Sequence, residues 1–108
     1  MGEELLHIRH SFQVEGEKRW RFWSAVRVTA DGEEVIDSTQ PLLEPAKPAY
    51  RGLELRKATE KPSVAAFEYE NRLRLEHRQL VAQLQAQGWE PMEQDRDGRV
   101  VRMRRAQR

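Results

Sequence analysis

Histidine is the residue type best suited to acid–base or metal chemistry in this chain, which has three histidines and no cysteine. His7 and His10 are three residues apart in a predicted strand, so their side chains point to opposite faces and do not share a metal ion. His77 follows Glu76 on a predicted helix, where positions 73 and 81 hold leucine and valine instead of a second ligand. Because such sites need several converging groups, we predict no catalytic residue, no metal site and no cofactor, and we expect that the protein is not an enzyme. A small-molecule or metal site around His77 is a further hypothesis, which requires a concave pocket.

A second set of residues combines positive charge with one aromatic ring. The first predicted hairpin places four of them on one sheet face: Arg9, Arg21, Trp23 and Arg27. Arg102 and Arg104, near the C-terminus, would extend this surface. Single-stranded DNA or RNA binds to such surfaces, because arginines contact phosphates and bases stack on aromatic rings. The alternative is an ordinary solvated face on which the arginine stems cover the indole.

The charge of the chain is balanced in total but uneven along the sequence. Its 19 basic and 18 acidic residues give a net charge of +1, which argues against a general polyanion binder. Five arginines and no acid occur from Arg99 to Arg108, and four basic residues and no acid occur from Lys18 to Arg27. These segments are therefore the local positive regions. All six glycines are isolated, so the sequence has no glycine-rich phosphate loop.

Length and composition predict one small domain that spans residues 1–108. Apolar residues make up 38% of the chain and charged residues 34%, so we expect a thin core with a sheet covered on one side. No apolar stretch approaches the roughly 20 residues of a membrane span. The acidic N-terminus is unlike a secretory signal. We therefore expect a cytoplasmic protein that does not bind to membranes.

Two runs of alternating apolar residues predict the first two strands. Even positions from Leu6 to Val14 and from Trp20 to Val28 are mostly apolar, and successive side chains of a strand point to opposite faces. A five-residue turn over residues 15–19 would match the two apolar faces through three pairs: Val14–Trp20, Phe12–Phe22 and Ile8–Val26. We therefore expect the even-numbered side chains from 6 to 28 to face the core.

A third strand completes an antiparallel meander over residues 1–38. Asp31-Gly32 is typical of a two-residue hairpin turn, because both residues tolerate positive φ angles. This turn would place Val28 opposite Val35. The predicted strands cover residues 4–14, 19–30 and 33–38.

A proline-rich connection is predicted over residues 39–61, because prolines interrupt regular structure. They lie at Pro41, Pro45 and Pro48. Within this connection, the alternation from Arg51 to Lys57 is that of a short fourth strand.

One long helix is predicted over residues 62–88, from Pro62 or Ser63 to a closing Gly88. Its apolar stripe contains Ala66, Tyr69 or Phe67, Leu73, Leu80, Val81 and Leu84. Its solvent-exposed side has three pairs of opposite charges four residues apart: Glu68–Arg72, Glu70–Arg74 and Arg72–Glu76. At about 37 Å, such a helix would be longer than the sheet it covers.

A second hairpin and a basic tail are predicted over residues 89–108. A two-residue turn at Asp97-Gly98 implies three cross-strand pairs: Met92–Met103, Glu93–Arg102 and Gln94–Val101. Glu93 and Arg102 have opposite charges, which supports this register. Pro91 lacks an amide hydrogen and therefore indicates an edge strand.

The end of the helix and the start of the next strand resemble a known junction. The residues that match are Leu80, Leu84, Gly88, Trp89 and Glu90. They are similar to the helix–Gly-Trp-Glu–strand junction of small, mostly uncharacterised bacterial β–α–β domains, over about a quarter of the chain. Those domains usually end in an aromatic-basic strand, whereas this chain ends in Arg102-Met103-Arg104-Arg105. The resemblance implies a fold element and no activity.

The sequence thus predicts an α+β fold: an antiparallel meander, a proline-rich crossover, one long helix packed on the sheet and a C-terminal hairpin. We predict a non-catalytic binding or assembly module that forms a homo-oligomer, since a thin core and a long helix leave apolar surface for a partner. A sheet edge or the overhanging helix would form the contact between two copies. The predicted interface residues are Phe67, Tyr69 and Trp23. The alternative function is the binding of single-stranded nucleic acid by the basic-aromatic face.

Overall fold

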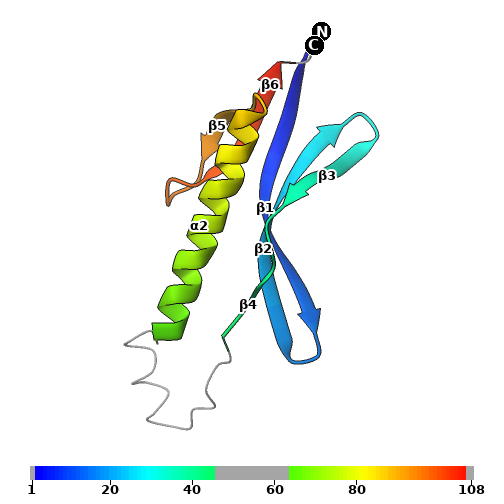
Figure 1. Ribbon diagram of the computed structural model, residues 1–108. Coiled ribbons are helices and arrows are strands. Elements are labelled where there is room, and N and C mark those ends of the chain that lie inside the picture. Colours follow the sequence, from blue (N-terminus) through cyan, green and yellow to red (C-terminus); the bar gives the residue numbers. More distant parts are fainter. Residues whose placement is uncertain (1, 46–63, 107–108) are drawn as a thin grey trace.

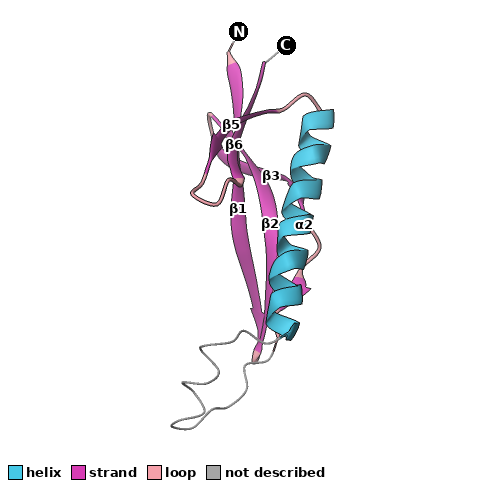
Figure 2. Cartoon of the chain, turned by 90° about the vertical axis from the view of Figure 1, so that its left-hand side faces the viewer, coloured by secondary structure: helices cyan, strands magenta, loops and turns pink. Residues whose placement is uncertain are grey.

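The computed structural model describes residues 2–45 and 64–106 of the chain. Its elements are β1 (Glu3–Glu15), β2 (Lys18–Thr29), β3 (Gly32–Ser38), β4 (Leu42–Leu43), α2 (Val64–Ala86), β5 (Glu90–Gln94) and β6 (Val100–Ala106). Within these residues, six strands form one antiparallel sheet in the order β3-β2-β1-β6-β5, with β4 paired to β2. Helix α2 lies along one face of this sheet (Figure 1, Figure 2).

This architecture confirms the predicted α+β fold with its meander, long helix and C-terminal hairpin. The predicted crossover lies for the most part outside the described residues, as does the predicted strand from Arg51 to Lys57. Between Pro41 and Pro45 the chain forms β4, which pairs with the start of β2. In the described ranges, no helix has both the length and the apolar character that a membrane crossing requires.

The turn between β1 and β2 differs from the prediction. Glu15 pairs with Lys18, so the loop contains only Gly16 and Glu17. Gly16 has a φ of 62° and Glu17 does not have a positive φ. Positive φ at the first central position alone is the signature of a type II′ turn, which takes glycine there. The five-residue turn is therefore wrong, as are its pairs Val14–Trp20, Phe12–Phe22 and Ile8–Val26.

The shorter turn reverses the faces of β2 relative to the prediction. Leu6 and Ile8 of β1 are buried in the core, as expected. Ile8, however, pairs with Ala25, and the odd-numbered side chains of β2 therefore share its face. Trp23 is 6% exposed and belongs to the core cluster. Trp20 and Phe22, predicted as core residues, are half-buried on the opposite face, which we call the open face because α2 does not cover it.

The β2–β3 hairpin keeps Val28 and Val35 on one face, but this is the open face instead of the predicted core face, and its pairs are displaced by two residues. Val35 pairs with Val26 instead of Val28, because the turn lies at Ala30 and Asp31. Val26 is 4% exposed although it lies on the open face. Arg9, opposite Ser24, forms an ion pair with Glu33, opposite Val28, so this pair spans β2 at the level of Val26.

Helix α2 ends as its sequence predicts. Gly88 has a φ of 96°, and its N–H donates to the carbonyl of Gln85 at 3.0 Å. The N–H of Trp89 donates to the carbonyl of Leu84, also at 3.0 Å. These two bonds form a Schellman motif, in which glycine occupies the left-handed position. The motif turns Trp89 back into the core beside Leu84.

The C-terminal hairpin is partly as predicted. The expected pair Glu93–Arg102 forms, with 3.2 Å between its charged groups. β5 is an edge strand, as the proline at its second position indicates. The loop has three residues instead of two, because the N–H of Asp95 donates to the carbonyl of Arg99. Two bulges follow in the ladder, so the predicted pairs Met92–Met103 and Gln94–Val101 are wrong, and the observed pairs are Pro91–Met103 and Gln94–Val100.

One apolar cluster lies between the sheet and α2. It contains Leu6, Ile8, Trp23, Ala25, Leu80, Leu84, Trp89 and Met103. The helix has 23 residues and spans about 35 Å, whereas β1 has 13 residues and spans about 43 Å. The predicted overhang of the helix is therefore wrong.

Candidate functional site

The residues predicted to bind nucleic acid do not share a face. Arg9, Arg102 and Arg104 lie on the open face, since Arg102 pairs with His7 and Arg104 with Leu5. The remaining three, Arg21, Trp23 and Arg27, lie on the face toward α2. The Trp23 indole is enclosed, and its Nε1–H donates to the carbonyl of Leu73 at 2.9 Å. The predicted exposed ring is therefore wrong, and no base can stack on Trp23 in this fold.

Carboxylates neutralise most of the described arginines. Arg102 lies 3.2 Å from Glu93, and Arg27 lies 2.5 Å from Glu34. In total, nine arginines lie within 3.9 Å of a carboxylate oxygen: Arg9, Arg19, Arg21, Arg27, Arg72, Arg99, Arg102, Arg104 and Arg105. Exposed ion pairs of this kind contribute little to stability. They nevertheless cancel the positive charge that the sequence concentrates in two segments.

The histidines of the core face are held by neighbouring groups. His10 stacks on Trp23 with 4.7 Å between ring centroids, and the hydroxyl of Ser24 forms a hydrogen bond with that of Ser11. The Nε2–H of His77 donates to the carbonyl of Val100 at 2.9 Å. In the described part of the chain, no three metal-ligating side chains come close enough together to hold an ion.

Burial of these rings implies a dependence of stability on pH. Burial lowers the pKa of His77 below its ordinary value, and burial together with Arg21 lowers the pKa of His10. Burial thus favours the neutral form of both rings in the folded state. Below about pH 6.5 the unfolded chain takes up protons that the folded chain does not. We expect the free energy of unfolding to be constant above that pH and to fall as the pH decreases toward the lowered pKa values.

Denaturant unfolding at pH 7.5, 6.5 and 5.5 measures this effect. The variant His77→Gln is expected to flatten the slope below pH 6.5, because it removes one of the two groups. His7→Gln, which changes a histidine on the open face, is the matched control and is expected to keep the wild-type slope. An unchanged slope in His77→Gln would contradict the assignment.

The outer side of α2 carries a second apolar stripe. The buried row of the helix is Leu73, His77, Leu80 and Leu84. At about 100° per residue, Leu75 lies about 200° around the helix from Leu73, on the opposite side. Val64 and Ala82 share this outer side, and Phe67 lies at its edge, about 80° around the helix from Leu75. We call these four residues the outer stripe: Val64, Phe67, Leu75 and Ala82. Its large members are 74%, 61% and 46% exposed, in that order.

The three predicted interface residues differ in their exposure. Phe67 lies in the outer stripe and is exposed. Tyr69 is half-buried, with the Arg21 guanidinium 6.0 Å from its ring centroid. Trp23 is buried and is not available to a partner. Sequence reasoning missed Val64 and Leu75, although their spacing from Phe67 is a helical period that could have identified them.

Two edge strands of the sheet carry acidic residues: β3 has Glu33, Glu34 and Asp37, and β5 has Glu90 and Glu93. Four of these five carboxylates form ion pairs with arginines, so their charge does not by itself exclude pairing between two copies. Residues 8–15 of β1 also pair on one side only among the described residues. The outer stripe of α2 differs from these edges because its large exposed side chains are apolar, which makes it a candidate for contact between copies.

Comparison with protein families, with curated proteins and with solved structures found no match to this chain. The candidate sites therefore rest on the geometry of this fold.

Proposed function

We propose that the chain is a non-catalytic assembly module, in which the outer stripe of α2 packs against the outer stripe of a second copy. The observation that carries this proposal is the exposure of Phe67 and Leu75 on the part of the helix that does not face the core. Removing such side chains from water is the main driving force for association.

In an antiparallel pair of helices, the outer stripe of one copy packs against the same stripe of the other copy. A two-fold axis beside Asn71 places position 67 of one helix next to position 75 of the other, because both are four residues from Asn71. Phe67 of each copy then covers Leu75 of the second copy. This contact is isologous, so it closes with two subunits.

The charges beside the stripe favour the same arrangement. Glu68 and Arg72 are one turn apart on one flank of the stripe. In the antiparallel pair the two equivalent flanks meet, and Glu68 of one copy lies near Arg72 of the other. A parallel pair would instead bring each flank against the opposite flank of the second copy, so that Glu68 would not meet Arg72.

The size of the stripe implies a weak dimer. A contact strip about 35 Å long and about 10 Å wide covers about 700 Å² on the two copies together. Stable interfaces bury at least about 1,000 Å². We therefore expect dissociation constants of tens to hundreds of micromolar, so that the state of the protein depends on its concentration.

Sedimentation velocity at about 10 to 500 μM tests the proposal. The wild type is expected to shift from monomer toward dimer across this range, whereas Leu75→Glu stays monomeric because it places two charges in the contact. Val35→Glu is the matched control, since Val35 is exposed on the open face. A wild type that stays monomeric throughout, or a loss of dimer in Val35→Glu but not in Leu75→Glu, would refute it.

The alternative function, binding of single-stranded nucleic acid, has less support. Its stacking residue Trp23 is buried, and the arginines assigned to it are paired with carboxylates.

A further inference from the structure

A cleft lies on the other flank of α2, between the helix and the β5–β6 turn. Its volume is 510 Å³, within the range of small-molecule sites. Arg74, His77 and Arg78 line it from the helix, and Asp97 and Arg99 line it from the turn. This cleft is separate from the outer stripe proposed above as the dimer contact.

The cleft contains two of the three described arginines that form no ion pair. Of the arginines in the described ranges, only Arg74, Arg78 and Arg96 form no ion pair. Arg74 and Arg78 are one helical turn apart and both line the cleft. Two guanidinium groups at this spacing are suited to hold one oxyanion between them.

The two acidic residues that line the cleft form ion pairs with arginines other than Arg74 and Arg78. Asp97 lies 2.7 Å from Arg99, and Glu70 lies 3.4 Å from Arg21. Neither carboxylate therefore neutralises Arg74 or Arg78. The backbone donors of the turn are also used, since the N–H groups of Asp97 and Arg99 both donate to Asp95. The two unpaired arginines are thus the groups left to bind an anion.

The cleft also has an apolar part. Val81 and Val100 line it and are packed against the core cluster. The His77 ring is 3% exposed and stands edge-on to Trp23, with 4.7 Å between the centroids. A ligand held by the arginines would therefore meet a surface of aliphatic and aromatic carbon next to the charged end.

We propose that this cleft binds the phosphate group of a small molecule through Arg74 and Arg78, with an apolar part of the ligand on Val81 and Val100. A phosphate group has the charge to match two arginines and the oxygens to accept from both. A single group fits better than a polyanion, because the arginines around the cleft are paired and form no continuous positive track.

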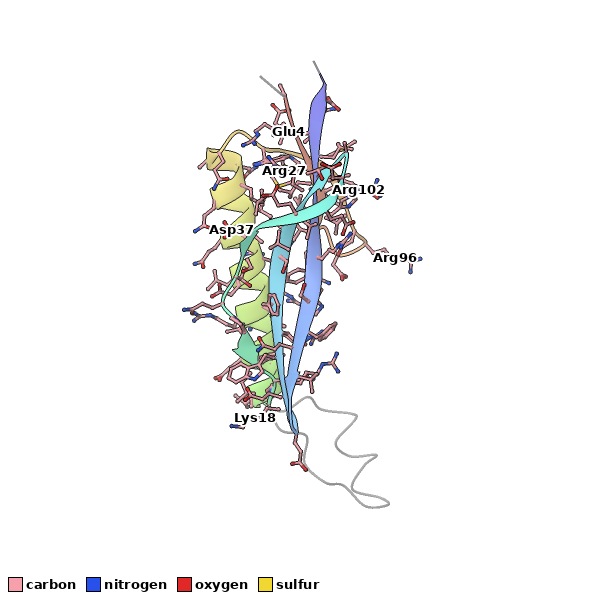
Figure 3. All side chains as sticks on the ribbon, turned by 90° about the vertical axis from the view of Figure 1, so that its right-hand side faces the viewer. Glu4, Lys18, Arg27, Asp37, Arg96 and Arg102 are labelled. Carbon is pink, nitrogen blue, oxygen red and sulfur yellow. The ribbon has the colours of Figure 1, made fainter. Side chains whose placement is uncertain are left out.

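Titration with inorganic phosphate and with phenyl phosphate, followed by amide chemical shifts, tests the proposal. We expect shifts to centre on residues 74–81 and 97–100, and phenyl phosphate to bind more tightly than phosphate. The double variant Arg74→Gln/Arg78→Gln is expected to weaken both by at least about tenfold, since each lost contact is charge-assisted. Arg96→Gln is the matched control: Arg96 is unpaired but projects from the turn into solvent (Figure 3), and its loss is expected to change the affinity less than twofold.

Several outcomes would overturn the site. They are equal losses in Arg96→Gln and in the double variant, shifts spread over all arginines, or tighter binding of a single-stranded oligonucleotide that the double variant does not weaken. The same titration on Leu75→Glu separates this proposal from the dimer. Unchanged phosphate affinity in that variant places the site within one chain, whereas loss of affinity would contradict it.

Discussion

Replacing Trp23 by alanine is expected to lower the free energy of unfolding by about 3–5 kcal/mol, as for other buried aromatic residues. The indole is 6% exposed and lies between the sheet and the helix. Its loss would leave a cavity, remove the hydrogen bond that the indole donates to the Leu73 carbonyl, and leave the His77 ring without its aromatic neighbour. Equilibrium unfolding in urea, followed by circular dichroism, measures the change.

Two further variants separate the causes of this loss. Trp23→Phe keeps most of the volume but removes the donor to Leu73, and about 1–3 kcal/mol is expected. Trp20→Ala truncates a half-buried indole on the open face and is expected to cost less than half as much as Trp23→Ala. A larger loss in Trp20→Ala than in Trp23→Ala would mean that the faces of β2 are those of the five-residue turn.

Leu84→Ala is expected to lower the free energy of unfolding by about 2–5 kcal/mol. The Leu84 side chain is fully buried in the core cluster, and its carbonyl accepts the bond that directs Trp89 inward. The matched control is Leu75→Ala, the same substitution on the opposite side of the same helix. At concentrations where the protein is monomeric, we expect Leu75→Ala to change stability by no more than about 0.5–1 kcal/mol.

The contrast between the two leucines tests how α2 is oriented on the sheet. Similar losses at both positions would contradict the orientation described here. Thermal unfolding is a suitable second measurement, because both variants keep the same helix propensity and differ only in burial.

Five strands (β1, β2, β3, β5 and β6) and the helix could be identified from sequence, because each has a clear period or end signal. β4 could not, because its two residues lie between prolines and carry no period. The register of the first hairpin could not be predicted, because β2 carries apolar residues on both of its faces. Its even positions carry more apolar residues, but Trp23 and Ala25 on the odd positions are the ones that meet α2. Gly16 at the first central position of a two-residue turn outweighs the apolar match of the longer turn.

The candidate sites were predictable to different extents. The outer stripe could be predicted from the helical spacing of Phe67 and Leu75 alone. The cleft could not be predicted without the tertiary structure, because the β5–β6 turn is brought beside Arg74 and Arg78 only when β6 pairs with β1. Which arginines stay unpaired also depends on that arrangement, since Glu70 reaches Arg21 of β2 instead of forming the predicted pair with Arg74.

The pairing of β1 with β6 has a consequence for the order of folding. Glu3 pairs with Ala106, so this ladder joins the two ends of the described chain, which lie together in Figure 1. The β1–β2 hairpin closes a loop of two residues, so its formation loses little chain entropy. The β1–β6 contacts close a loop of nearly the whole chain and lose more. Met103 of β6 is a core residue, so the surface that receives the helix is complete only after that closure. The rate of folding is therefore expected to be set by this long-range event and to be slow for a chain of this size.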